Sequence, residues 1–168
     1  MPTIFISKEL KFKENESSID HFIIQTAFPR LSEQVQSKHL QFDIRLLNPD
    51  QFSFPYHFHR YAEELMFIIS GSVTMRSPKG FQVLKQGDTV FFESGETGAH
   101  QLYNHTETPC TYLDIKTQKD HDICEYPDSG KVNISTHREI FEKNTQVDYF
   151  KGEEGIKERW NKLKNQQD

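Results

Sequence analysis

Four residues near the middle of the chain have the types and spacing of a metal site. His57 and His59 are two residues apart, Glu64 follows within the length of one hairpin, and His100 lies further along the chain. Three imidazole nitrogens and one carboxylate suit a redox-active or Lewis-acidic divalent transition metal. On a six-coordinate metal they would leave two positions for water, a chelating substrate or dioxygen. Because the imidazoles must bind in their neutral form, metal affinity should fall below pH ~6.5.

The local pattern predicts strands that turn the three histidines to one side. On an extended chain, His57 and His59 point to the same face and Phe58 points to the opposite one. Two ligands on one strand can then reach the same metal. On a later strand, His100 shares a face with Leu102 and can point inward as well.

The carboxylate ligand is Glu64 or its neighbour Glu63. In the apolar run 64–69, Glu64 is in phase with Met66 and Ile68, so it faces the interior if they do. Glu63 stands at the start of the run, where it is freer to face solvent. We therefore predict Glu64 as the ligand.

The elements that would hold these residues are short strands. From residue 39 to residue 116, β-branched and aromatic runs recur, each closed by Gly, Pro, Asn or Asp, as in an all-β barrel or sandwich. We expect a barrel over residues 36–134, preceded by an arm or edge strands over residues 1–35. Residues 135–168 form a C-terminal extension, in which Ile156, Trp160 and Leu163 share one face of a short predicted helix.

Composition excludes several classes of function. The chain has 168 residues and a formal net charge of −5, without a stripe of Lys and Arg, so a nucleic-acid partner is not expected. No apolar run reaches the roughly 20 residues of a membrane span, and no signal peptide pattern is present, so we expect a cytoplasmic protein without a membrane partner. Cys110 and Cys124 have no metal-type spacing and are expected as free thiols.

The spacing of these residues resembles the two sequence motifs of the cupin family. The first motif reads Gly-x5-His-x-His-x(3 or 4)-Glu-x6-Gly. His57, His59, Glu64 and Gly71 match it, whereas Gln51 stands where the leading glycine is expected.

The second cupin motif reads Gly-x5-Pro-x-Gly-x2-His-x3-Asn. Gly87, Gly95, His100 and Asn104 match it, and Glu93 replaces the proline. Four residues instead of two separate Gly95 from His100, which could shift this histidine or reshape the mouth of a pocket. The motifs cover about residues 40–115, and the segment 125–132 is similar to one found in small single-domain cupins of undetermined function.

The resemblance implies a double-stranded β-helix, or jelly-roll barrel, with one divalent transition metal in its interior. Iron, manganese, nickel, zinc and copper occur across cupins, and we expect iron, manganese, nickel or zinc here. Cupins are commonly homodimers. A homodimer is also expected because the apolar face of Leu65, Phe67 and Ile69 needs a cover. Cupin activities range from dioxygenation, decarboxylation and isomerisation to plain ligand binding, so the fold does not select the reaction.

The most concrete function is a metal-dependent enzyme, of dioxygenase type, that acts on a small organic molecule at His57, His59, Glu64 and His100. A sugar-type isomerase is an alternative, although the sequence identifies no proton acceptor for it. A non-catalytic protein or sensor that binds a metal and a small ligand is another. The candidate pocket walls are Phe54, Tyr56, Tyr61, Met66, Ile68, Phe91 and Leu102.

Overall fold

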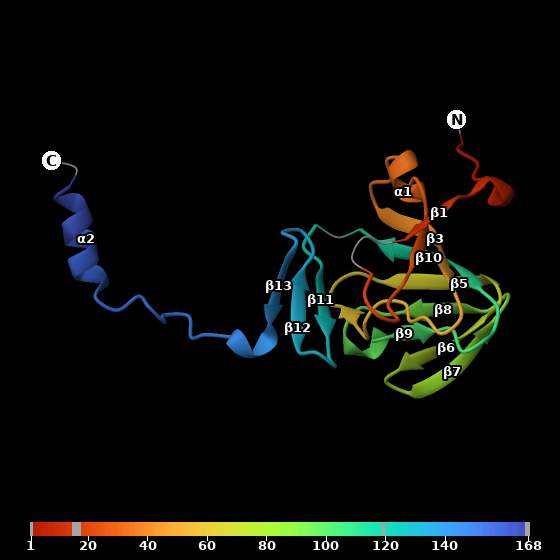
Figure 1. The fold of residues 1–168 in the computed structure, drawn as a ribbon. Helices are drawn as coiled ribbons and strands as arrows, with labels where there is room; N and C mark the ends of the chain where they lie inside the picture. The colour runs from red at the N-terminus through yellow and green to blue at the C-terminus, as the bar shows by residue number, and fades with distance from the viewer. Residues whose placement is uncertain (1, 15–17, 119, 167–168) are drawn as a thin grey trace.

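The computed structural model describes residues 2–14, 18–118 and 120–166, and Figure 1 shows their arrangement. Antiparallel strands form a barrel, and two short α-helices, α1 (Leu31–Gln34) and α2 (Ile156–Lys164), lie outside it. The structure confirms the predicted all-β jelly-roll barrel with an N-terminal arm and a short C-terminal helix.

One wall of the barrel is a six-stranded sheet with the order β1-β2-β3-β10-β5-β8. Its strands are β1 (Phe12–Glu14), β2 (Gln25–Ala27), β3 (Leu40–Leu47), β10 (Cys110–Thr117), β5 (Glu64–Ser70) and β8 (Thr89–Phe92). The two edge strands β1 and β2 belong to the N-terminal arm, so this arm widens the wall instead of forming a separate unit.

The opposite wall consists of two smaller sheets. One has the order β7-β6-β9, with β7 (Gly80–Lys85), β6 (Ser72–Ser77) and β9 (Gln101–Tyr103). The other has the order β13-β12-β11-β4, with β13 (Glu139–Glu142), β12 (Lys131–Ile134), β11 (Ile123–Tyr126) and β4 (Phe58–His59). An isolated antiparallel bridge between His57 and His100 links them. Two of the predicted ligands therefore lie at the junction of the sheets.

The interior of the barrel changes from apolar to polar along its axis. The side chains that face inward from β3, β10 and β5 alternate with outward ones, as on any strand. In register, and from the apolar end to the open end, they form the rows Leu47–Cys110, Arg45–Tyr112–Ile68, Asp43–Asp114–Met66 and Gln41–Lys116–Glu64. The apolar rows join a buried core with Val73, Met75, Leu84, Phe92 and Leu102. The polar rows open toward solvent.

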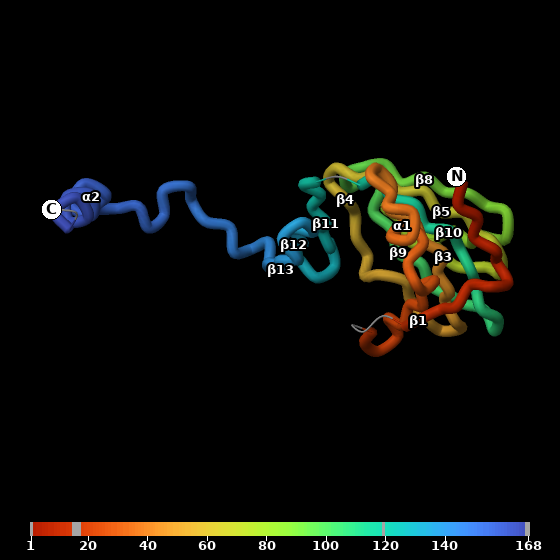
Figure 2. Tube along the Cα trace, turned by 90° about the horizontal axis from the view of Figure 1, so that it is seen from above, coloured from red at the N-terminus to blue at the C-terminus, as the bar shows by residue number. Residues whose placement is uncertain are grey.

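The C-terminal extension leaves the barrel after β13. A short 3-10 turn, η3 (Lys143–Thr145), is followed by an extended segment that carries α2 away from the barrel, as Figures 1 and 2 show. Within the described residues, no helix is long and apolar enough to cross a membrane.

Candidate metal centre

The bridge between the two smaller sheets places His57 opposite His100. Each backbone N–H donates to the carbonyl of the other residue, over 3.2 Å from His57 and 2.9 Å from His100. Their rings lie 4.7 Å apart between centroids, and the ring of His59 lies 5.3 Å from that of His57. All three histidines are buried. The fold thus brings together side chains that are far apart in sequence.

Hydrogen bonds at Nδ1 fix the orientation of two histidine rings. Nδ1 of His57 donates to the carbonyl of Pro55 over 2.8 Å, and Nδ1 of His100 donates to the carbonyl of Gly98 over 2.8 Å. Since a carbonyl oxygen can only accept, the proton of each neutral ring is on Nδ1. Each Nε2 then carries a lone pair, which is the form that binds a metal.

The third histidine is held by a carboxylate. Nδ1 of His59 donates to Asp122, whose other carboxylate oxygen accepts the backbone N–H groups of Tyr61 and Ala62 over 3.4 and 3.3 Å. Asp122 is buried, and although burial raises its pKa, the hydrogen bond from His59 lowers the pKa overall. A carboxylate behind an imidazole strengthens it as a metal ligand.

Glu64 lies between the histidines. Its Oε1 is 3.6 Å from Nε2 of His59, and its Oε2 is 3.2 Å from Nε2 of His100. Although Nε2 of His100 and Oε2 of Glu64 are close enough for a hydrogen bond, both are buried without a hydrogen-bond partner among the described residues. Two acceptors that face each other in the protein interior need a cation or a proton between them. The donor set therefore fits a divalent metal ion.

The environment keeps these groups in the forms that bind a metal. Burial, with the neighbouring His100, lowers the pKa of His57 to about 3, so its ring is neutral at neutral pH. Burial alone would raise the pKa of Glu64, but His100, His59 and His57 lower it to about 2. Glu63, the alternative carboxylate, is exposed, as the strand phase indicated.

Among the described residues, two overlapping groups of side chains could hold an ion. His57, Glu64 and His100 form one group, and His57, His59 and Cys124 form the other, with ligand atoms within 4.8 Å of one another in each. Burial raises the pKa of the Cys124 thiol to about 12, so it is protonated at neutral pH and a poor ligand. The carboxylate group is the better candidate. Both cysteines are free thiols, as predicted.

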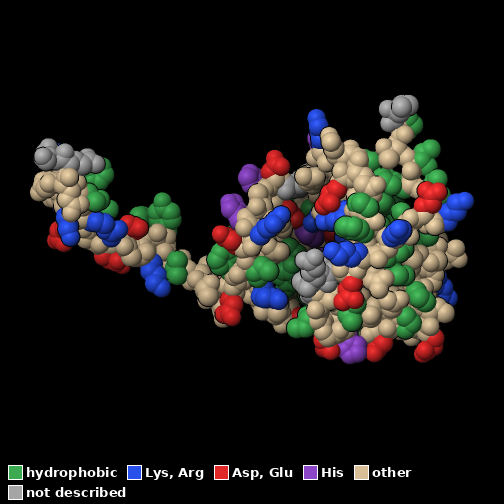
Figure 3. All heavy atoms as spheres, turned by 45° about the horizontal axis from the view of Figure 1, so that its top comes forward, with side chains coloured by type: hydrophobic (Ala, Val, Ile, Leu, Met, Phe, Trp, Pro, Cys, Tyr) green, Lys and Arg blue, Asp and Glu red, His purple; other side chains and the backbone are tan. Residues whose placement is uncertain are grey.

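A cavity of about 1040 Å³ opens beside His57, His59 and Glu64. Figure 3 shows the hollow in the face of the barrel, with a histidine side chain visible inside it. Such a volume is at the upper end of small-molecule sites. Most of its lining residues are polar or charged, and they include side chains from β1, β2, β3, β10, β11 and β12.

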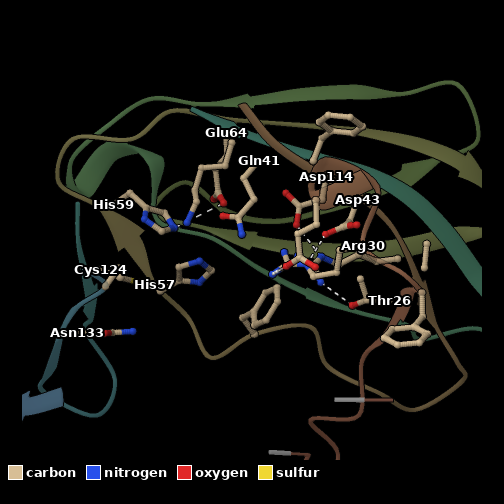
Figure 4. Close-up of a pocket in the computed structure, with 18 of the residues that line it drawn as sticks. Thr26, Arg30, Gln41, Asp43, His57, His59, Glu64, Asp114, Cys124 and Asn133 are labelled. Carbon is tan, nitrogen blue, oxygen red and sulfur yellow. Dashed lines mark hydrogen bonds and ion pairs between the residues drawn. The ribbon is translucent and has the colours of Figure 1, made fainter. Parts of the chain in front are cut away.

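The part of the cavity away from the histidines is lined by paired charges, and Figure 4 shows it. Nε of Arg30 donates to Asp43 over 2.8 Å, and Nε of Arg45 donates to Asp114 over 2.7 Å. Nη1 of Arg45 also donates to the hydroxyl of Thr26. Because each arginine has a carboxylate partner, these pairs mainly shape the wall.

The longer approach to His100 is absorbed by a 3-10 turn, η2 (Glu96–Gly98). This turn presents the carbonyl of Gly98 to Nδ1 of His100. The ring of His100 also stacks on Phe92, with 3.7 Å between centroids. The additional residues therefore support His100 instead of displacing it.

Of the predicted pocket walls, only Phe54 lines the cavity. Tyr56 lies beneath the guanidinium of Arg76, 3.9 Å from ring centroid to Cζ, and lines a separate groove of about 380 Å³. It differs from the expectation because it alternates with His57 and so faces the other side of the wall. Tyr61 and Phe91 are 55% and 54% exposed and do not line the cavity.

The phase of β8 explains the position of Phe91. Its neighbour Phe92 is the inward residue, in register with Glu64, and forms part of the core. Met66, Ile68 and Leu102 do face the interior, as expected from phase, but they are packed in the core and do not line the cavity.

Sequence reasoning missed several polar residues of the site. Lys116 and Asp114 point inward from β10, and the period-two alternation of that strand could have revealed them. Asp122 comes from a polar loop in which no periodic signal marks it. Its role depends on a contact between residues 63 positions apart.

Comparison with family models identifies a match to the family described as "Cupin domain" over residues 44–116. This range contains all four predicted ligands. No curated protein matches the chain.

The solved structures include several with the same fold. A candidate sugar phosphate isomerase from Acidithiobacillus ferrooxidans has a TM-score of 0.76 at 20% identity, over 86% of this chain and 95% of that one. A sugar phosphate isomerase of the cupin superfamily from Silicibacter pomeroyi has a TM-score of 0.74 at 16% identity, over 88% and 98%. A predicted oxalate decarboxylase from Thermotoga maritima has a TM-score of 0.57 at 20% identity, over 70% and 100%.

Proposed function

We propose that this chain, whose residues 44–116 match the cupin domain family, is a metal-dependent isomerase of a small, anionic carbonyl compound of the sugar phosphate class. The proposal places the metal between His57, His59, Glu64 and His100. The substrate would occupy the cavity beside them.

The observation that carries the metal centre is the buried pair formed by Nε2 of His100 and Oε2 of Glu64. Both atoms are acceptors when the His100 ring is neutral and Glu64 is ionised, and they face each other without a hydrogen bond among the described residues. A divalent cation would satisfy both, together with Nε2 of His57 and His59. Once bound, it would supply Lewis-acid polarisation of a carbonyl or hydroxyl oxygen.

The lining of the cavity supports a polar substrate. The walls carry charged and amide side chains, among them Lys116 and Gln41, and Phe54 is one of few aromatic residues beside the histidines. An apolar substrate would leave these groups without partners. Two of the solved structures, with TM-scores of 0.76 and 0.74, are described as sugar phosphate isomerases, which supports this reaction class.

A dioxygenase is the second candidate function. Three histidines and one carboxylate leave room on a six-coordinate metal for a chelating substrate and dioxygen. A protein that binds a metal and a small ligand without turnover is the third. These functions share the metal centre and differ in what happens to the ligand.

The metal centre is tested by elemental analysis of protein purified without chelator. Wild-type protein should hold close to one divalent transition metal per chain, and a variant with both His57→Ala and His59→Ala should hold almost none. Glu64→Gln should lower retention, whereas Glu63→Gln serves as a matched control and should not. Unchanged metal content in the double variant would overturn the assignment.

The reaction class is tested with aldose and ketose phosphates in D₂O. An isomerase should catalyse metal-dependent incorporation of deuterium next to the carbonyl, seen by NMR, because isomerisation moves that proton. Dioxygen uptake without deuterium incorporation would instead establish the oxygenase. Binding of these compounds without either signal would favour the non-catalytic function.

A further inference from the structure

A row of three polar side chains crosses the wall beside the metal centre. In the ladder of β3, β10 and β5, Lys116 pairs with Gln41 on one side and with Glu64 on the other. All three line the cavity. Since Glu64 is a predicted metal ligand, Gln41 and Lys116 are the next side chains that a ligand extending from the metal along this wall would meet.

Gln41 and Lys116 have side-chain hydrogen-bonding groups that no other described residue engages. Both are half-buried, and within residues 2–14, 18–118 and 120–166 neither side chain has a hydrogen bond or ion pair. Two arginines of the same cavity differ in this respect, because Arg30 and Arg45 are each paired with an aspartate. The wall therefore combines two paired arginines with Lys116, which has no carboxylate partner within 4.0 Å among the described residues.

The positive charge of Lys116 becomes important for ligand binding once a metal is present. Two carboxylates, Glu64 and Asp122, lie among the histidines, and together they balance a divalent ion. Lys116 is close enough to Asp122 and Cys124 to affect both electrostatically. With the metal bound, its ammonium group is left as excess positive charge in a partly desolvated site. An anion in the cavity would neutralise that charge.

We propose that Lys116 and Gln41 form a subsite for an oxyanionic group, a carboxylate or a phosphate, of the ligand that the metal binds. The ammonium group supplies charge and up to three donors, and the amide of Gln41 adds a donor that helps to orient the group. This inference rests on the proposed function and deepens it, because it assigns the anionic part of the substrate to a particular place on the wall.

The test measures anion binding to metal-loaded full-length protein by calorimetry, with oxalate and inorganic phosphate as probes. Lys116→Met keeps the length of the side chain and removes its charge, so oxalate affinity should fall about tenfold or more. Lys116→Arg should retain most of the affinity, and Gln41→Leu should lose less than Lys116→Met. Lys85→Met, a charge removal on the exposed face of β7, is the matched control and should bind as wild type does.

Metal content separates the two possible failures. If the wild type and Lys116→Met hold the same amount of metal and bind oxalate and phosphate equally well, the subsite is wrong and the metal centre stands. If the wild type holds no metal, the proposed function fails, and the subsite fails with it. Equal losses in Lys116→Met and Lys116→Arg, with metal retained, would show that packing and not charge matters, and would also overturn the subsite.

Discussion

Each histidine of the candidate centre donates its Nδ1 proton to a different acceptor, and only His59 donates to a carboxylate. A carbonyl fixes the ring and its tautomer. A carboxylate does the same and also increases the electron density at Nε2. Asp122 therefore acts as a positioning residue that contributes to metal affinity without contacting the metal.

Replacement of Asp122 by Asn should weaken metal binding about 10-fold or more, because outer partners of ligating histidines typically contribute factors of 10 to 100. The measurement is competition for the metal against a chelator of known affinity. Asp120→Asn, the same change at an exposed neighbouring position, should leave the affinity unchanged. Equal affinity of wild type and Asp122→Asn would show that the carboxylate only orients the ring.

At the residue scale, the sequence predicts the ligand types and their phase but not their supports. Period-two alternation is enough to place Glu64 inward and Glu63 outward. The acceptors Pro55 and Gly98 are backbone carbonyls, which every residue has, so no residue type signals them. The prediction that Phe91 lines the pocket was wrong, because the inward face of β8 was assigned one residue too early. Phe92 is the buried, inward residue, and Phe91 is exposed.

At the scale of elements, the turn η2 determines where His100 lies. Gly98 is buried in this turn, and a Cβ atom on it would approach the carbonyl oxygen of Glu93 to 1.9 Å. No side chain can be accommodated there without moving the backbone. The same glycine supplies the carbonyl that orients His100.

Gly98→Ala should therefore destabilise the fold by about 1–3 kcal/mol, as other overpacked sites do, and should also reduce metal retention. Thermal unfolding and elemental analysis measure the two effects. Thr97→Ala is the control, because Thr97 is exposed in the same turn and its side chain faces away from the core. Normal metal content in Gly98→Ala would mean that the turn does not position His100.

The strands themselves were predictable, whereas their pairing was not. Short alternating runs and turn residues indicate each strand locally, but the register that aligns Lys116 with Glu64 and Gln41 joins segments far apart in the chain. The polar row beside the metal centre is a product of that register. The inward residues of one strand can be predicted from the sequence. The cavity that several strands enclose cannot, because it depends on their register.

At the scale of the whole molecule, the part of the C-terminal extension that follows η3 lies away from the barrel. Figures 1 and 2 show it extending away from the sheets. The large apolar side chains that follow η3 are more than half exposed: Val147, Tyr149, Phe150, Ile156, Trp160 and Leu163. Clusters of this kind on soluble proteins usually mark an interaction site. The homodimer expected from the sequence remains a prediction, and this segment offers a surface for it.

We predict that the full-length chain is a homodimer at micromolar concentration and that the C-terminal extension contributes to the contact. A variant with Tyr149→Ser, Phe150→Ser and Trp160→Ser should shift toward the monomer mass in light scattering, because burial of aromatic side chains is a main source of interface energy. Its metal content should not change, since none of the three replaced residues lines the cavity. Phe81→Ser, which removes another exposed aromatic residue from the barrel, should leave the dimer intact. A monomeric wild type would refute the homodimer, and a triple variant that stays dimeric would move the contact to the barrel, where Phe67 is only partly covered.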